Sequence, residues 1–337
     1  MITKYFLHKK RKLTFAAVET MPYIGGKKVL VCPLNWGLGH ATRCIPIIER
    51  LITNGNEVII AADGLPLTLL KERFPDLKTI KSPSYAVRYS AGKSQILVLL
   101  LQLPRILKGI WKENRWLNQL LQKENVDLVI SDNRFGLWTK HCRCVYMTHQ
   151  IMIKMPQSLK WAESLAYRLH KAIISRYDEC WIPDNAENGL SGDLAHRYPL
   201  PANARFIGLL SRFGGKTFAP DSSYETVALI SGPEPQRSLL EQAIIREFSD
   251  KNERLLLLRG LPGNSELPET SVNIDPKAHL EDSQLAPFLL GCQRIICRSG
   301  YSSIMDLQAL NCLHKATLIP TPGQTEQEYL AELHGIR

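Results

Sequence analysis

The sequence lacks the patterns that mark several common classes of protein. Its eight cysteines form no C-x-x-C pair and no Cys/His spacing typical of zinc sites, which favours a reduced, cytosolic setting. The most apolar run, Ile96–Leu103, has about eight residues, far fewer than the roughly 20 that span a bilayer. No signal peptide, P-loop or D-x-D triplet is present. We therefore expect no transmembrane helix and chemistry that needs no bound metal.

What the sequence does contain is typical of a folded α/β protein. Its 337 residues are 45% hydrophobic and 22% charged, which suits two globular domains. The net charge of +10 is unevenly distributed, because residues 1–210 carry +14 and residues 211–337 carry −4. No basic and aromatic pattern typical of a nucleic-acid-binding module accompanies the excess, so we do not expect a nucleic-acid partner.

Short apolar runs alternate with amphipathic stretches from Lys28 onward, the pattern of parallel strands joined by crossover helices. This pattern predicts two Rossmann-like, doubly wound units separated by a Gly- and Ser-rich segment. The predicted boundaries are a basic tail at 1–27, a first domain at 28–207, a linker at 208–224 and a second domain at 225–337. The expected strands of the two domains are Val29–Pro33, Glu57–Ala62, Leu77–Lys81, Asp127–Ser131, Arg143–Thr148 and Glu179–Pro183, then Thr226–Ile230, Arg254–Leu258, Arg294–Cys297 and Ala316–Pro320.

Polar residues follow several strands of the first domain, where open α/β sheets bind ligands. Gly37 and Gly39 let backbone amides approach an anion or a sugar, and His40 stands at the start of the next helix. Asp132 and His149 follow two other strands and should lie on the same rim. Each of the three could equally be a capping, loop or packing residue.

Small residues stand at the corresponding places in the second domain. Gly232 and the Ser299-Gly300 pair, with Ser302, place amides and hydroxyls at helix starts, which suits a diphosphate; ordinary Ser-capped turns are the alternative. Asp306 could accept a ribose hydroxyl, or be a solvated surface acid. Gln324 and Gln327 offer the donors and acceptors that hydroxyl-rich ligands need.

Taken together, these segments resemble the two-domain GT-B glycosyltransferases of family 28, which include the N-acetylglucosaminyltransferases of peptidoglycan synthesis. Residues 37–40 resemble the family's G-G-x-G-G-H loop, residues 298–306 its S-x-x-G…E segment and residues 326–331 its H-Q-x-x-N-A segment. The resemblance covers about residues 28–337 and implies two domains facing a cleft.

The resemblance implies an inverting, metal-independent transfer of a hexose-type sugar from a nucleotide-diphosphate donor, expected to be UDP-linked, to an acceptor hydroxyl. His40 would be the base or the acceptor-orienting group, with Asp132 or His149 as its helper. Arg43 replaces the family's proline, Asp306 its glutamate and Glu326 its histidine. Because family members usually continue into a further strand and a final helix, a chain that stops at Arg337 suggests a shortened second domain.

Two other functions remain open for this architecture: a nucleotide-sugar 2-epimerase and a protein that binds nucleotide-sugars without turnover. The basic, Trp-containing segment Lys93–Lys123 leaves a further choice. It is either an ordinary core helix with a basic outer face or a patch that contacts an anionic membrane and admits a lipid-linked acceptor. We expect a cytoplasmic protein in either case, and in the second case one that is peripheral to the inner face of the plasma membrane.

Overall fold

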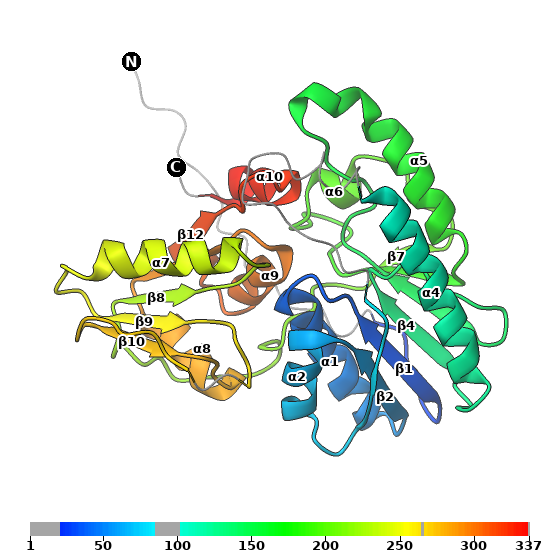
Figure 1. The fold of residues 1–337 in the computed structure, drawn as a ribbon, viewed down its shortest axis with the longest axis horizontal. Coiled ribbons are helices and arrows are strands. Elements are labelled where there is room, and N and C mark those ends of the chain that lie inside the picture. Colours follow the sequence, from blue (N-terminus) through cyan, green and yellow to red (C-terminus); the bar gives the residue numbers. More distant parts are fainter. Residues whose placement is uncertain (1–20, 85–101, 264–265, 336–337) are drawn as a thin grey trace.

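The computed structural model describes residues 21–84, 102–263 and 266–335, which form two α/β domains (Figure 1). The first contains a seven-stranded sheet in the order β3-β2-β1-β4-β5-β6-β7, and the second a five-stranded sheet in the order β10-β9-β8-β11-β12. All pairings are parallel. The predicted pair of doubly wound domains is confirmed.

The strands of the first sheet are β1 (Lys28–Pro33), β2 (Glu57–Ala62), β3 (Lys78–Lys81), β4 (Leu128–Asp132), β5 (Arg143–Met147), β6 (Glu179–Ile182) and β7 (Ala204–Phe206). The helices of this domain are α1 (Leu38–Thr53), α2 (Gly64–Arg73), α4 (Leu103–Leu121), the 3-10 helix η1 (Gln157–Ala162), α5 (Glu163–Ile174) and α6 (Asp193–His196). Of the predicted Lys93–Lys123 segment, residues 93–101 lie outside the described residues.

The second domain contains β8 (Thr226–Leu229), α7 (Gln236–Phe248), β9 (Leu255–Leu258), β10 (Ile274–Lys277), α8 (Asp282–Gly291), β11 (Arg294–Arg298), α9 (Tyr301–Ala309), the 3-10 helix η2 (Leu313–Lys315), β12 (Ala316–Ile319) and α10 (Thr325–His334). Residues 207–225, between the two sheets, contain no helix or strand. They are nonetheless packed, because Ile207, Leu210 and Phe213 are buried.

Successive side chains of a strand point to opposite faces of the sheet, so the apolar strands of the first sheet form a hydrophobic core on each face. Val29 and Val31 of β1 belong to the core beneath α1 and α2, while Leu30 and Cys32 belong to the core beneath α4 and α5. Met21 and Ile24, which precede β1, are buried in the α1 side of the core. In both sheets the strand order reverses beside the first strand, and in such folds ligands bind at the carboxyl ends of the strands at this reversal.

Candidate active site

The three predicted catalytic residues come together at the carboxyl edge of the first sheet. His40 lies in the first turn of α1, directly after β1, and Asp132 is the last residue of β4, in register with Pro33 of β1. His149 follows β5, the neighbour of β4. His40 Nδ1 lies 3.1 Å from Asp132 Oδ2. The position of strand ends in a parallel sheet thus explains why residues far apart in sequence meet here.

A residue that sequence reasoning did not assign to the site lies at its centre. The Arg43 guanidinium is almost fully buried and holds Asp132 in a two-pronged ion pair, with Nε at 3.0 and 2.9 Å from the two carboxylate oxygens and Nη2 against Oδ1. Its Nη2 lies 2.9 Å from His40 Nδ1, and its Nη1 lies 3.1 Å from His149 Nδ1. One turn of α1 separates Arg43 from His40, which places both side chains on the same helix face.

His149 connects this cluster to the second domain. Its Nε2 lies 2.7 Å from Oε1 of Glu326 on α10, and its ring stacks on Tyr301 of α9 with centroids 4.2 Å apart and planes 3° from parallel. The same Tyr301 donates its hydroxyl to the carbonyl of Pro183, beyond β6. We call the five polar residues of this arrangement the Arg43 network: His40, Arg43, Asp132, His149 and Glu326.

Burial and charge set the ionisation of this network. Burial is the largest influence on Asp132 and opposes its charged form, but Arg43 and His40, through their charges and hydrogen bonds together, outweigh it and hold the pKa of this carboxyl below its usual range. Burial likewise disfavours charged Glu326, yet His149 keeps its pKa below normal. For His40, burial is the largest influence and lowers the pKa, and Arg43 lowers it further against the opposing pull of Asp132. The network therefore holds ionised carboxylates beside a neutral His40 at neutral pH.

The glycine loop of the first domain touches the second domain. Gly37 has a φ of 114°, a conformation that favours glycine, and it precedes the first residue of α1. Ser302 Oγ on α9 donates to the carbonyl of Gly39 at 2.8 Å. A Cβ atom at position 39 would lie about 3.0 Å from Ser302 Oγ, which is a tight contact. Glycine at this position therefore permits the close packing of the loop against α9.

The residues predicted to bind a donor gather around the start of α9 and α10. Gly300 caps α9, and Gly232, with a φ of 111°, follows β8 on the neighbouring strand. Ser299 Oγ donates to the carbonyl of Gln327. The side-chain Oε1 of Gln327 accepts from Thr321 N, and its Nε2 donates to Gln324 Oε1. In this structure, therefore, Ser299, Gln324 and Gln327 shape the loop that leads into α10.

Asp306 also has internal partners in this structure. Its two carboxylate oxygens accept from Ser211 Oγ at 2.7 Å and Arg212 Nε at 3.0 Å, both in the segment between the two sheets. Burial raises the pKa of Asp306 despite Arg212. A ribose hydroxyl would have to share or replace these contacts, and the ribose role of Asp306 stays a prediction.

Arg43, Glu326 and Tyr301 are the site residues that sequence reasoning missed. Arg43 and Glu326 each stand where this chain departs from the motifs that it otherwise resembles, and the departure itself was the available signal. Tyr301 had none beyond its place next to Gly300. No group of three or more His, Cys, Asp or Glu side chains suited to a metal ion occurs within 21–84, 102–263 and 266–335.

The fold and the strand-end site together define a GT-B architecture, and comparisons with known proteins agree. No protein-family model matches the chain. An uncharacterized glycosyltransferase of Methanosarcina acetivorans is 22% identical over 330 residues, which cover 89% of this chain and 81% of that protein.

Solved structures share the fold. The spinosyn rhamnosyltransferase SpnG superposes with a TM-score of 0.58 at 16% identity, covering 91% of this chain and 83% of that one. A protein described as a candidate UDP-N-acetylglucosamine 2-epimerase of Listeria monocytogenes gives a TM-score of 0.52 at 12% identity over 92% of this chain and 88% of that one. The predicted GT-B fold is confirmed, and both transferases and an epimerase-type protein share it.

Proposed function

We propose that this protein is a glycosyltransferase that moves a hexose-type sugar from a nucleotide-diphosphate donor to an acceptor hydroxyl. The observation that carries the proposal is the Arg43 network, which joins the strand-end site of the first domain to α10 of the second. The curated relative is itself described as a glycosyltransferase. The motifs at residues 37–40, 298–306 and 326–331 support a more specific proposal. In it the protein is a member of family 28, its donor is UDP-linked, and the transfer inverts the configuration of the sugar without a metal ion.

The second domain supplies the donor side of the proposed reaction. Helix N-termini carry partial positive charge and free amides, which bind phosphate oxygens well. α9 begins directly after Ser299 and Gly300, and at Gly232, beyond the adjacent strand end, a Cβ would meet no atom within 4 Å, so there is open space beside its backbone. We assign the diphosphate to these amides, which neutralise its charge as it departs.

In the transfer step, the acceptor oxygen forms a bond to C1 of the sugar as the bond from C1 to the diphosphate breaks. The diphosphate leaves with the electron pair of that bond, and the acceptor hydroxyl gives up its proton. Attack from the opposite side inverts the configuration at C1. His40 contacts the acceptor hydroxyl as its base or its orienting group, depending on which ring nitrogen carries the imidazole proton.

Helices α4 and α5 suggest where the acceptor comes from. They cover the same face of the first sheet, because Leu117 of α4 and Ile174 of α5 belong to one apolar core, and Figure 1 shows both helices on that side of the sheet. Their acids, Glu113 and Glu163, are buried and paired with Arg134 and Arg197, so every exposed charge on α4, η1 and α5 is basic. We call the exposed apolar residues of these helices the α4–α5 surface: Leu103, Leu107, Trp111, Trp161, Leu165 and Leu169.

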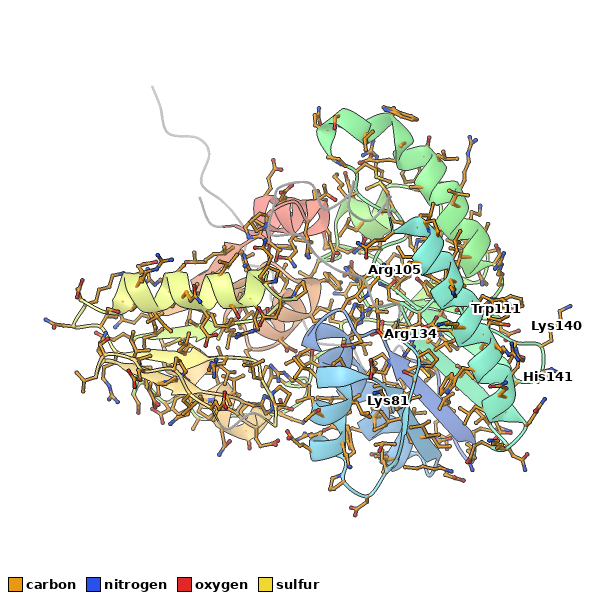
Figure 2. The ribbon with its side chains drawn as sticks, in the orientation of Figure 1. Lys81, Arg105, Trp111, Arg134, Lys140 and His141 are labelled. Carbon is orange, nitrogen blue, oxygen red and sulfur yellow. The ribbon has the colours of Figure 1, made fainter. Side chains whose placement is uncertain are left out.

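Apolar side chains set among basic ones suit an anionic lipid surface. Trp111 is 58% exposed and Trp161 75% exposed, and Figure 2 shows Trp111 and Arg105 together on α4. We propose that this surface rests on the inner face of the plasma membrane and that the acceptor is lipid-linked. No helix among the described residues has the length and apolarity needed to cross a bilayer.

The proposed activity is tested by measuring nucleotide release. The protein is first screened for thermal stabilisation by a panel of nucleotide-sugars, since a ligand of the native state raises the melting temperature. The stabilising donors are then incubated with and without lipid-linked and simple glycoside acceptors. We expect release of free nucleotide diphosphate that requires the acceptor. Binding without release would indicate a binding protein, and an epimerised sugar without acceptor would indicate an epimerase.

His40→Ala is the companion variant. It should lower turnover by about 10²–10⁴ while leaving the donor-induced thermal shift in place, because His40 lies on the acceptor side of the site. Unchanged turnover would remove His40 from the reaction.

A further inference from the structure

Arg43 has a hydrogen-bonding capacity that constrains its neighbours. A guanidinium carries five N–H donors and no acceptor. Arg43 directs Nε and Nη2 at Asp132, Nη2 also at Nδ1 of His40 and Nη1 at Nδ1 of His149. Each imidazole nitrogen that faces Arg43 must therefore offer a lone pair.

His149 shows that this constraint is met. Its Nδ1 lies 3.1 Å from Arg43 Nη1 and its Nε2 lies 2.7 Å from a carboxylate oxygen of Glu326. An ionised carboxylate only accepts, so Nε2 must carry the proton and Nδ1 must accept. Both contacts specify the same tautomer, with the proton on Nε2.

For His40 the two neighbours of Nδ1 make opposite demands. Asp132 Oδ2, at 3.1 Å, would accept a proton from Nδ1, whereas Arg43 Nη2, at 2.9 Å, can only donate to it. Asp132 already receives N–H groups from Arg43 and does not depend on His40. A proton on Nδ1 would instead point at a buried cationic N–H. The closer neighbour, Arg43 Nη2, cannot accept a hydrogen bond and therefore keeps Nδ1 of His40 unprotonated. The lowered pKa of His40 disfavours the doubly protonated ring.

We infer that Arg43 is a positioning residue that keeps the imidazole proton of His40 on Nε2, so that His40 meets substrate as a hydrogen-bond donor. The inference deepens the proposed function and rests on it for the identity of the substrate. Within the described residues Nε2 of His40 has no hydrogen-bond partner, and the side chain is 16% exposed. His40 then orients a substrate oxygen and keeps its proton, and the acceptor proton passes to water or to the departing diphosphate.

Two conservative variants of His40 distinguish a role as hydrogen-bond donor from a role as general base. The side-chain amide of Gln can place an N–H near the position of Nε2, whereas that of Asn reaches only the position of Nδ1. We expect His40→Gln to stay within about tenfold of wild-type kcat, and His40→Asn to lose about 10²–10³, as for loss of a donor that stabilises developing charge. Equal and large losses for both variants would show that His40 is a base and overturn the inference.

The tautomer itself can be observed without any substrate. Long-range ¹H–¹⁵N correlation on protein labelled with ¹⁵N-histidine distinguishes protonated from unprotonated ring nitrogens, and the His40→Gln spectrum assigns the missing signal. We expect an unprotonated Nδ1 and a protonated Nε2 for His40. In Arg43→Lys, which keeps the charge beside Asp132 but loses the planar fork, we expect His40 to move toward the Nδ1-protonated form. An Nδ1-protonated His40 in the wild type, or no change in Arg43→Lys, would overturn the inference.

These readouts separate failure of the inference from failure of the proposed function. Absence of acceptor-dependent nucleotide release would refute the transferase while leaving the tautomer result standing. Transfer activity combined with an Nδ1-protonated His40 would retain the transferase and refute the role of Arg43. If Arg43→Lys does not fold, the wild-type spectrum and the Gln and Asn variants still decide.

Discussion

Asp132 illustrates how strongly a single buried charge can control this site. It is fully buried, and its ion pair with Arg43 is the centre of the network. Removing one member of such a pair leaves the other charge buried without compensation, which commonly costs about 3–5 kcal/mol. The chemistry of the site and the stability of the first domain therefore depend on the same contact.

We expect Asp132→Asn to lower the free energy of unfolding by about 3–5 kcal/mol, measured by urea denaturation. Asp193→Asn is the matched control, because the Asp193 side chain is 46% exposed in its ion pair with Lys154, and the change should alter stability by less than about 1 kcal/mol. Equal effects of the two variants would contradict the central role of Asp132.

His170 gives the stability a dependence on pH that is separate from the site. It is buried, its Nε2 lies 3.1 Å from the hydroxyl of Tyr146, and burial lowers its pKa from 6.5 to about 4. Between these values the unfolded chain binds more protons at this residue, so stability falls as the pH falls from 7 toward 4. From pH 7 to pH 5 the loss from His170 is about 2 kcal/mol.

The variant His170→Gln retains a hydrogen-bonding group but does not titrate. Urea unfolding of wild type and variant at pH 7 and pH 5 should show a pH dependence that is weaker in the variant by about 2 kcal/mol. Parallel curves would show that His170 does not titrate on unfolding as expected.

At the level of single residues, the sequence predicted where the site residues lie in the sheet better than it predicted which side chains they contact. That His40, Asp132 and His149 would share a rim follows from strand ends alone. That Arg43 links them could not be predicted, because the side-chain direction of a buried arginine depends on the packing of α1 against β4. Glu326 meets His149 only once the two domains are placed together.

Among the elements, the apolar strands and the edge strands β3 and β12 were predicted, whereas the edge strands β7 and β10 were missed. β8, β9 and β11 are apolar and mostly buried, and their sequences indicate strands directly. β10 is only Ile274–Lys277, contains Pro276 and pairs with β9 alone, and β7 has three residues. Edge strands tolerate proline and need little apolar content, so sequence periodicity gives almost no signal for edge strands as short as β7 or with a proline as in β10.

The α4–α5 surface leads to a prediction about membranes. We expect the wild-type protein to float with liposomes that contain anionic lipid at low salt, and less so with neutral liposomes, because exposed charge on these helices is entirely basic. The double variant Trp111→Ser, Trp161→Ser should lose most of this binding. Leu239→Ser on α7, where the side chain is 47% exposed, is the control and should bind like wild type.

Equal flotation of the double variant and the control would show that membrane binding, if present, uses another surface. No flotation of the wild type with anionic lipid at low salt would remove the membrane proposal and leave α4 and α5 as ordinary covering helices.

For the molecule as a whole, the two domains are connected through specific contacts as well as through the chain. Tyr301 binds the carbonyl of Pro183, Ser302 binds that of Gly39, and Glu326 binds His149. α10 adds a hydrogen bond from Thr325 to the carbonyl of Lys154. These contacts place the donor side and the acceptor side of the proposed reaction against each other.

Glu326→Ala should shift the domains toward a more open arrangement, since a hydrogen bond to a charged group contributes about 1.5–3 kcal/mol. The measurement is the radius of gyration by small-angle X-ray scattering, which should increase. Glu328→Ala, two residues away on the same helix and exposed, should leave the radius as in wild type. An unchanged radius in Glu326→Ala would mean that the other contacts hold the domains by themselves.

The Arg43 network also has a consequence for the history of the sequence. Replacement of Arg43 by proline would leave Asp132 buried without its cation and His149 without its donor, while replacement of Glu326 by histidine would place two imidazoles against each other. Either change alone is costly, although the two positions lie at opposite ends of the chain. Among homologues we therefore expect arginine at 43 and glutamate at 326 to be inherited and lost together, a pattern of covariation that an alignment of related sequences can reveal.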